Sequence, residues 1–148
     1  MAITQAMCTS FKSELLQAVH NFKASGGNSF KLSLYTNSAV LGKSTTSFTT
    51  DAQVSNSGQY TSGGGALVNG GTSLSTNTAI VDFADRSFTG VTLTARGALI
   101  YNTTTDGGSN TTDAVAVLDF GGDKTATSGT FTITFPAAEA TAAILRIA

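Results

Sequence analysis

The chain has 148 residues, enough for one domain with a substantial core, and 41% of them are hydrophobic. Only 11% are charged, against roughly 25% in an average globular domain, so the surface must be built mainly from Thr, Ser, Asn and Gly, as suits a protein packed against neighbours. The net charge of −1, with no cluster of Lys or Arg, argues against a nucleic-acid role, and no apolar run approaches the roughly 20 residues of a membrane helix.

The N-terminal segment, residues 5–23, is the one stretch with helical periodicity. Its apolar residues recur at spacings of three and four, which gives one apolar face; they are Met7, Phe11, Leu15, Ala18 and Phe22. The sequence Ser-Gly-Gly at 25–27 is expected to end the helix. Such a helix must cover either its own sheet or a neighbouring subunit. The first residues lack the basic and long apolar parts of a signal peptide, so we expect synthesis in a cytoplasm without export by the usual route.

From residue 30 the sequence changes to short β-like runs separated by Gly, Asn, Ser and Asp. We expect strands at 30–36, 46–50, 78–84, 87–95, 97–103, 114–120, 130–135 and 142–148. The glycine-rich segment 56–71 is interpreted as a loop, and Pro136 follows the end of a strand. The sequence therefore predicts a mainly β fold, an antiparallel sandwich or a jelly-roll-like barrel with one N-terminal helix. We divide it into an N-terminal helix, 1–27, and a single β domain, 28–148, which form one structural unit.

The stretch DFGGDKTAT at 119–127 contains two look-alikes of catalytic motifs. Asp119-Phe120-Gly121 spells the metal-binding tripeptide of protein kinases, and the sequence from Asp123 to Thr127 is one residue away from the phosphorylated motif of P-type ATPases. The other parts of either machinery are missing, and Lys124 is not preceded by the glycine of a P-loop. We therefore interpret 121–123 as the turn of a hairpin between strands 114–120 and 130–135.

The segment 103–113 is rich in oxygen ligands but does not match an EF-hand loop. A looser Ca²⁺ site at Asp106, Asn110 and Asp113 remains an alternative to a solvated hairpin tip. Two glycosylation patterns, beginning at Asn102 and Asn110, carry little weight without a secretion signal. We predict no cofactor and no metal.

Nucleophilic chemistry has few candidates. Cys8 is the only cysteine, and it is interpreted as a small buried hydrophobe. The only histidine, His20, is interpreted as a partly exposed residue of the helix, about 18 Å from Cys8 along a continuous helix axis. A catalytic set with a distant serine stays open, although the nucleophile-elbow pattern is absent.

Asp82, Asp85 and Arg86 lie close together in the sequence. Two carboxylates can hydrolyse a glycosidic bond when a cleft holds them at a suitable separation. The favoured alternative is that Arg86 and Arg96 pair with aspartates within or between subunits.

Several stretches resemble a group of small virion structural proteins of tailed bacteriophages. They are 30–42, 82–102 and 114–136, and the phrases ARGALIYN and LDFGGDKTATSG are the most specific parts. The resemblance implies a location in the virion after synthesis in the host cytoplasm. Its extension is a capsid decoration or cement protein, which sits on the head as a trimer and binds the major capsid protein. No catalytic residue carries over.

We therefore expect a non-enzymatic protein that stabilises the head by binding between capsomers, with itself and the major capsid protein as partners and without nucleic acid or membrane. The expected contact surfaces are the helix stripe and the glycine-rich segment, represented by Phe11, Leu15, Phe22, Gly63, Gly64, Leu67 and Val68. Two alternatives remain, a tail or fibre module that recognises host carbohydrate and a small hydrolase using Asp82 or Asp85.

Overall fold

The computed structural model describes residues 2–104 and 111–148. The fold is mainly β and antiparallel, with one short N-terminal helix, as predicted, and it is a sandwich rather than a closed barrel. The elements in chain order are β1 Ala6–Met7, α1 Thr9–Leu16, β2 Phe30–Tyr35, β3 Gly65–Ala66, β4 Asn69–Ser75, β5 Thr78–Phe83, β6 Arg86–Asn102, β7 Ala114–Ile133 and β8 Leu145–Ile147.

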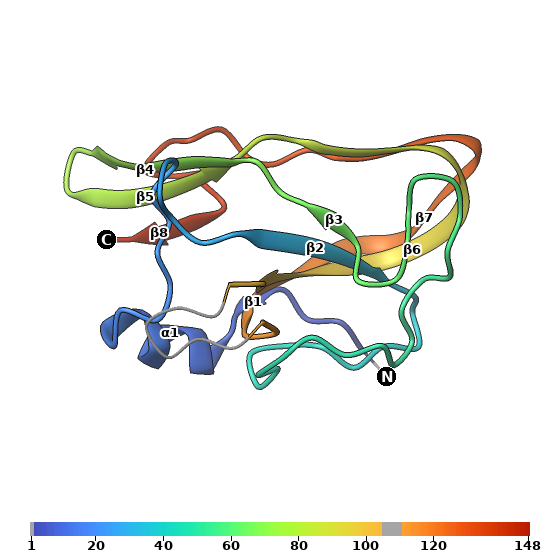
Figure 1. Cartoon of the computed structure of the whole chain (residues 1–148), viewed down its shortest axis with the longest axis horizontal. Coiled ribbons are helices and arrows are strands. Elements are labelled where there is room, and N and C mark those ends of the chain that lie inside the picture. Colours follow the sequence, from blue (N-terminus) through green and yellow to red (C-terminus); the bar gives the residue numbers. More distant parts are fainter. Residues whose placement is uncertain (1, 105–110) are drawn as a thin grey trace.

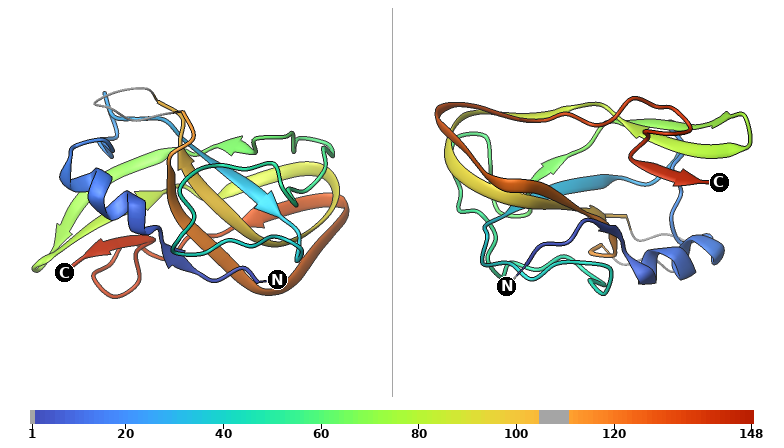
Figure 2. Two further views of the ribbon diagram at one scale, coloured as in Figure 1. Left: turned by 90° about the horizontal axis from the view of Figure 1, so that it is seen from below. Right: turned by 180° about the vertical axis from the view of Figure 1, so that it is seen from behind.

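The strands form two sheets. The large sheet has the order β1-β7-β6-β2-β3, and the small sheet has the order β4-β5-β8. The small sheet lies on one side of the β2–β6–β7 layer, while α1 and the irregular segment 36–57 lie on the other side (Figure 1; Figure 2, right). Since β2 is covered from both sides, nearly all of its residues are buried, including the polar Ser33.

A long hairpin of β6 and β7 dominates the large sheet. Its register runs from Tyr101 opposite Ala114 to Arg86 opposite Ile133. The hairpin runs along one side of the molecule, curves back and returns through the middle layer (Figure 1). Register shifts interrupt its pairing repeatedly between Phe88 and Gly97, and such bulges bend strands and increase their twist.

An aromatic cluster joins the two sheets. Phe30 of β2 stacks on Phe22 with ring centroids 4.6 Å apart and planes 6° apart. Phe83 of the small sheet meets Phe30 edge-on at 5.7 Å, and Phe135 lies 6.0 Å from Phe83. These contacts belong to one continuous core that includes Phe11 of the helix.

The helix is shorter than the predicted 5–23 and ends at Leu16. Ala18 takes a positive φ of 60°, and the N–H groups of Ala18 and Val19 donate to the carbonyls of Leu15 and Glu14. This is a Schellman C-cap with alanine at the position that usually holds glycine. The cap diverts the chain early, so Phe22 reaches the aromatic cluster from the irregular residues that follow the helix and not from the helix face.

Several predicted strands have different bounds in the structure. The expected strands 87–95 and 97–103 are both parts of β6, and 114–120 and 130–135 are both parts of β7. Segment 46–50 forms only an isolated bridge, Ser47 with Asp113. Conversely, β3 and the start of β4 lie in the segment expected to be a loop, because their Gly-rich sequence carries little apolar alternation.

Two buried tyrosines attach the connection between β2 and β3 to β2. Tyr60 Oη accepts the N–H of Leu34 at 2.8 Å, and Tyr35 Oη donates to the carbonyl of Thr49 at 2.7 Å. Both side chains are fully buried, and burial raises the pKa of Tyr60 and raises that of Tyr35 to about 12. Hydrogen bonds of this kind hold loops that lack a ladder of their own.

Candidate functional site

The motif-like stretch from Asp119 is a bulge inside β7. Residues 120–123 stand opposite the single residue Arg96 of β6. The predicted hairpin turn at 121–123 is therefore wrong, because its two flanking segments pair with β6 and not with each other. Gly121 has a φ of 75° at this place and donates its N–H to Asp119 Oδ1 at 2.9 Å.

Charge pairing closes the same bulge. Arg96 Nε lies 3.7 Å from Asp119 Oδ1, and Arg96 Nη1 lies 3.7 Å from Asp123 Oδ1. Asp123 also accepts a hydrogen bond from Asn37 Nδ2 at 3.1 Å. The prediction that Arg96 pairs with aspartates is confirmed, and both aspartates of the motif-like stretch serve the bulge as structural acceptors.

Asp85 and Arg86 each make a contact within this chain. Asp85 Oδ1 accepts the backbone N–H of Phe135 at 2.8 Å. The Arg86 guanidinium lies over the ring of Phe88, 4.7 Å from its centroid, and its buried Nε has no hydrogen-bond partner among the described residues. The structure records a cation–π contact and no ion pair for Arg86 within 2–104 and 111–148. Pairing of Arg86 inside the described part of the chain is therefore not found, and pairing across a subunit interface stays a prediction.

His20 is buried, contrary to the expectation of a partly exposed helix residue. Its Nε2 lies 2.6 Å from Glu14 Oε2, and its Nδ1 lies 3.0 Å from Asn102 Nδ2. Asn102 Oδ1 accepts the N–H of Thr104, which fixes its amide orientation so that Nδ2 donates. His20 Nδ1 is then an acceptor, so the ring proton is on Nε2. The Nε2–H group donates a hydrogen bond to Glu14 Oε2. The helix ends before His20, so the axial separation from Cys8 that was expected does not apply.

Asn102 is part of the same buried network. Its Nδ2 also donates to Asn28 Oδ1 at 2.9 Å, and the residue has no exposed surface. A glycan cannot be attached to an amide that is enclosed and hydrogen-bonded in this way. The second pattern begins at Asn110, which lies outside the described residues.

The single cysteine behaves as predicted. Cys8 is fully buried, and its thiol pKa is raised to about 11, chiefly by burial and secondarily by the charge of Glu14. A thiol that stays protonated at neutral pH is a poor nucleophile.

The predicted calcium ligands fall mostly outside the residues that the structure describes. In 2–104 and 111–148 no group of three or more His, Cys, Asp or Glu side chains could hold a metal ion. Asp106 and Asn110 lie outside the described residues. Asp113 is buried, and its carbonyl accepts the N–H of Asn102 at the end of β6.

The predicted contact residues are placed unevenly. Phe11 and Phe22 belong to the chain's own core and are 1% and 6% exposed. The structure thereby places these two residues of the helix stripe against this chain's own sheets. Leu15, Leu67, Gly63 and Gly64 are partly buried, and Val68 is 69% exposed.

Two of the five exposed large apolar side chains in the described part of the chain lie on the small sheet. Leu74, Ala79 and Ile147 stand directly opposite one another on β4, β5 and β8 and therefore share one face. Leu74 is 77% and Ile147 is 54% exposed. We call these three residues the apolar row. The sequence predicted a contact surface at 61–71, next to Leu74 in the chain. It did not indicate the apolar row, because β4 is mostly Gly, Ser and Thr, and a single leucine among them does not indicate a surface.

An apolar cleft lies beside the apolar row. It has a volume of about 120 Å³ between α1 and the small sheet, and its walls include Phe11, Leu15 and Val81 together with Ile147. The two walls lie at the same end of the molecule (Figure 1).

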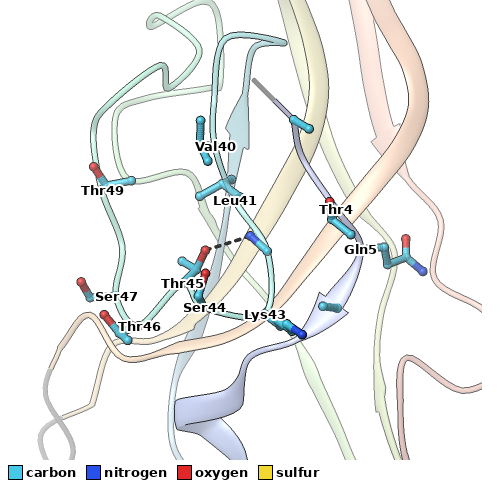
Figure 3. A pocket seen from close by; sticks show the side chains of 13 residues that line it. Thr4, Gln5, Val40, Leu41, Lys43, Ser44, Thr45, Thr46, Ser47 and Thr49 are labelled. Atoms are coloured by element: carbon cyan, nitrogen blue, oxygen red, sulfur yellow. Dashed lines mark hydrogen bonds between the residues drawn. The ribbon is translucent and has the colours of Figure 1, made fainter.

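A larger groove lies between the N-terminal segment 2–6 and the segment 40–49 (Figure 3). Its volume is about 990 Å³. Hydroxyl side chains supply much of its lining; they are Thr4, Ser44, Thr45, Thr46, Ser47 and Thr49. We call it the hydroxyl groove. Thr45 Oγ1 accepts the N–H of Gly42 at 3.0 Å, which shapes the loop.

Comparison with known proteins identifies no relative. No family model, no curated protein and no solved structure matches the chain. Among residues 2–104 and 111–148, no helix has the length and apolarity needed to cross a membrane.

Proposed function

We propose that this chain is a non-enzymatic structural protein of a tailed-bacteriophage virion, and more finely a decoration or cement protein of the capsid surface. Its partners are further copies of itself, as a trimer, and the major capsid protein. Two of the stretches that resemble phage virion proteins, 82–102 and 114–136, contain almost all of the β6–β7 hairpin. The proposal thus draws on the segment that organises the fold.

The observation that carries the proposal is the apolar row. Large apolar side chains exposed together on one sheet face favour an interaction surface. Charges do not interrupt this face, since the charged residues of β5 and β8, Asp82 and Arg146, alternate onto the other face. Burying Leu74 and Ile147 against a neighbour would release water from both side chains.

The rest of the surface supports an adhesive role. Cross-strand hydroxyl pairs stand where many proteins place ion pairs, as with Thr94 and Thr125, whose Oγ1 atoms are 2.8 Å apart. A surface of this kind carries little charge to oppose close approach of identical subunits. Many copies, each with a modest contact, would bind the head through avidity.

The first experiment tests the surface by mutation. Leu74→Asp and Ile147→Asp are expected to abolish self-association and binding to undecorated capsids, measured by light scattering and co-sedimentation. The matched control is Val40→Asp, which alters a side chain of similar exposure, 66%, on the segment 40–49. If both row variants bind capsids like the unmodified chain, the row is not the contact surface.

Location on the particle is tested separately. A reconstruction of the virion is expected to show this fold on the outside of the head at the threefold positions. Density on the tail would contradict the decoration role.

The hydroxyl groove supports a second candidate, a tail or fibre module that binds host carbohydrate. Hydroxyl and amide groups can bind sugar hydroxyls, but the groove has no aromatic side chain in its lining on which a sugar ring could stack. Binding on a glycan array that is lost in Thr46→Val would favour this role.

A further inference from the structure

An Asn-Gly pair opens strand β4. Asn69 pairs with Phe83 and Gly71 pairs with Asp82, so Gly70 is the extra residue of a β-bulge. The extra residue of a bulge is left out of the ladder. Gly70 is exposed and has no side chain to obstruct an approach to its backbone nitrogen.

The two ends of the Asn69 side-chain amide differ: the oxygen accepts a hydrogen bond, and the nitrogen has no partner among the described residues. Its Oδ1 accepts the N–H of Gly71 at 2.7 Å. Its Nδ2 is buried and has no hydrogen-bond partner among the described residues. The carbonyl is thereby activated toward a nucleophile, while the amide nitrogen gains no stabilisation in the ground state.

A carboxylate lies beside the bulged glycine. A methyl group placed on Gly70 would be 3.4 Å from Asp82 Oδ2 and 3.1 Å from the Asp82 carbonyl oxygen. Asp82 Oδ2 therefore lies next to the backbone of Gly70. This position makes the Asp82 carboxylate the nearest candidate, among the atoms closest to that methyl group, for a base acting on the Gly70 amide proton.

We propose that Asn69-Gly70 is a self-modification site at which the folded chain promotes its own deamidation. The Gly70 nitrogen attacks Asn69 Cγ and forms a new N–Cγ bond, while Asp82 takes the Gly70 amide proton. The Gly71 N–H donates to the oxyanion that develops on Oδ1. The Cγ–Nδ2 bond then breaks, and Nδ2 leaves as ammonia with the proton returned from Asp82.

The product of this step is a succinimide ring between residues 69 and 70. Water adds to one of its two carbonyls and opens the ring, which gives either aspartate or isoaspartate at position 69. The sequence of steps consumes one water, releases one ammonia and needs no oxidant or reductant. It adds a negative charge beside Asp82 at the start of β4, the strand that also carries Leu74.

Ordered structure usually slows deamidation, because it holds the backbone nitrogen away from the side-chain carbonyl. At Asn69 we expect the opposite, a faster reaction in the folded chain. The first experiment therefore incubates the full chain, folded and urea-unfolded, at the same mildly alkaline pH. Peptide mapping by mass spectrometry measures conversion at residue 69. Conversion is expected to be faster in the folded chain, and a slower folded rate overturns the proposal without reference to any variant.

A second experiment tests the role of Asp82. Asp82→Asn is expected to slow conversion at residue 69 by about tenfold or more. A positioned general base contributes at least about a hundredfold to a rate, so a tenfold loss is a conservative expectation. Asp85→Asn is the matched control, because an amide oxygen can still accept the N–H of Phe135. Asn56-Ser57 serves as an internal reference, since it is an Asn followed by a small residue in the same chain. Equal rates in Asp82→Asn and the unmodified chain would refute the assisted mechanism.

Discussion

Arg96 and Asp123 face each other across the widest break in the β6–β7 register, with Arg96 Nη1 3.7 Å from Asp123 Oδ1. The same guanidinium reaches Asp119 on the other side of the break. One side chain thus joins the two ends of the bulge, which explains why two aspartates flank a pair of glycines at this place.

Replacing Arg96 by Gln is expected to lower the free energy of unfolding by about 1 kcal/mol or less, because the ion pairs are partly exposed and screened by water. Urea unfolding at low and high salt measures this change. The difference in unfolding free energy between Arg96→Gln and the unmodified chain should shrink at high salt. Lys124→Gln is the control, since Lys124 makes no ion pair within the described residues. A loss above about 2 kcal/mol, outside the range for exposed pairs, would mean that the bulge itself collapses without Arg96.

Local patterns predicted the class of fold but not the continuity of its longest strands. Alternation at 130–135 and the apolar residues in 97–103 identified real strand segments. Glycines at 121 and 122 suggested a turn, but a bulge and a turn use the same residue types, and the partner strand decides between them. The pairing with β6 is a long-range property that no local window contains.

The helix illustrates a different limit. Residues 5–23 carry helical periodicity, yet Phe22 lies beyond the helix and stacks on Phe30. The tertiary packing of that ring outweighs the local preference of the segment. Likewise, the apolar row draws on three strands, so its members are unremarkable one at a time in the sequence.

Phe22→Ala is expected to destabilise the fold by about 3–5 kcal/mol, because it removes a buried ring from the aromatic cluster. Phe11→Asp should unfold the chain, since Phe11 is 1% exposed and a charge there has no partner. Thermal and urea unfolding measure both effects. Leu16→Ala is the control, with an expected change within about 0.5 kcal/mol, because Leu16 is 91% exposed. A mild effect of Phe22→Ala would show that the cluster does not hold the two sheets together.

Gly64→Ala tests the close contact between the glycine-rich segment and β2. Gly64 has a φ of 80°, and a methyl group there would collide with the carbonyl of Leu32. We expect a loss of stability of several kcal/mol, because both backbone strain and a steric clash oppose the variant. Gly26→Ala shares the positive φ, 73°, but meets no atom within 4 Å, so it should cost only about 1 kcal/mol. If both variants lose the same stability, backbone strain at a positive φ explains the loss and the clash with Leu32 contributes nothing.

Buried acids with raised pKa values make the fold sensitive to alkali. Burial raises the pKa of Cys8 from 9.0 to about 11, and raises those of Tyr35 and Tyr101 from 10.0 to about 12. As the pH rises, the unfolded chain releases these protons before the folded chain does. The contribution of these groups to the free energy of unfolding is therefore fully present below pH 9 and falls as the pH rises toward 12. Urea midpoints measured across this range test the trend.

Cys8→Ala separates the contributions of the thiol and the tyrosines. It should remove the part of the decline that begins near pH 9, where the unfolded thiol ionises, and leave the part that begins near pH 10 with the tyrosines. In the unmodified chain, thiol reagents should modify Cys8 slowly at neutral pH and rapidly once urea unfolds the protein. Rapid modification of the folded chain, or stability that stays constant up to pH 12, would contradict the burial of these groups.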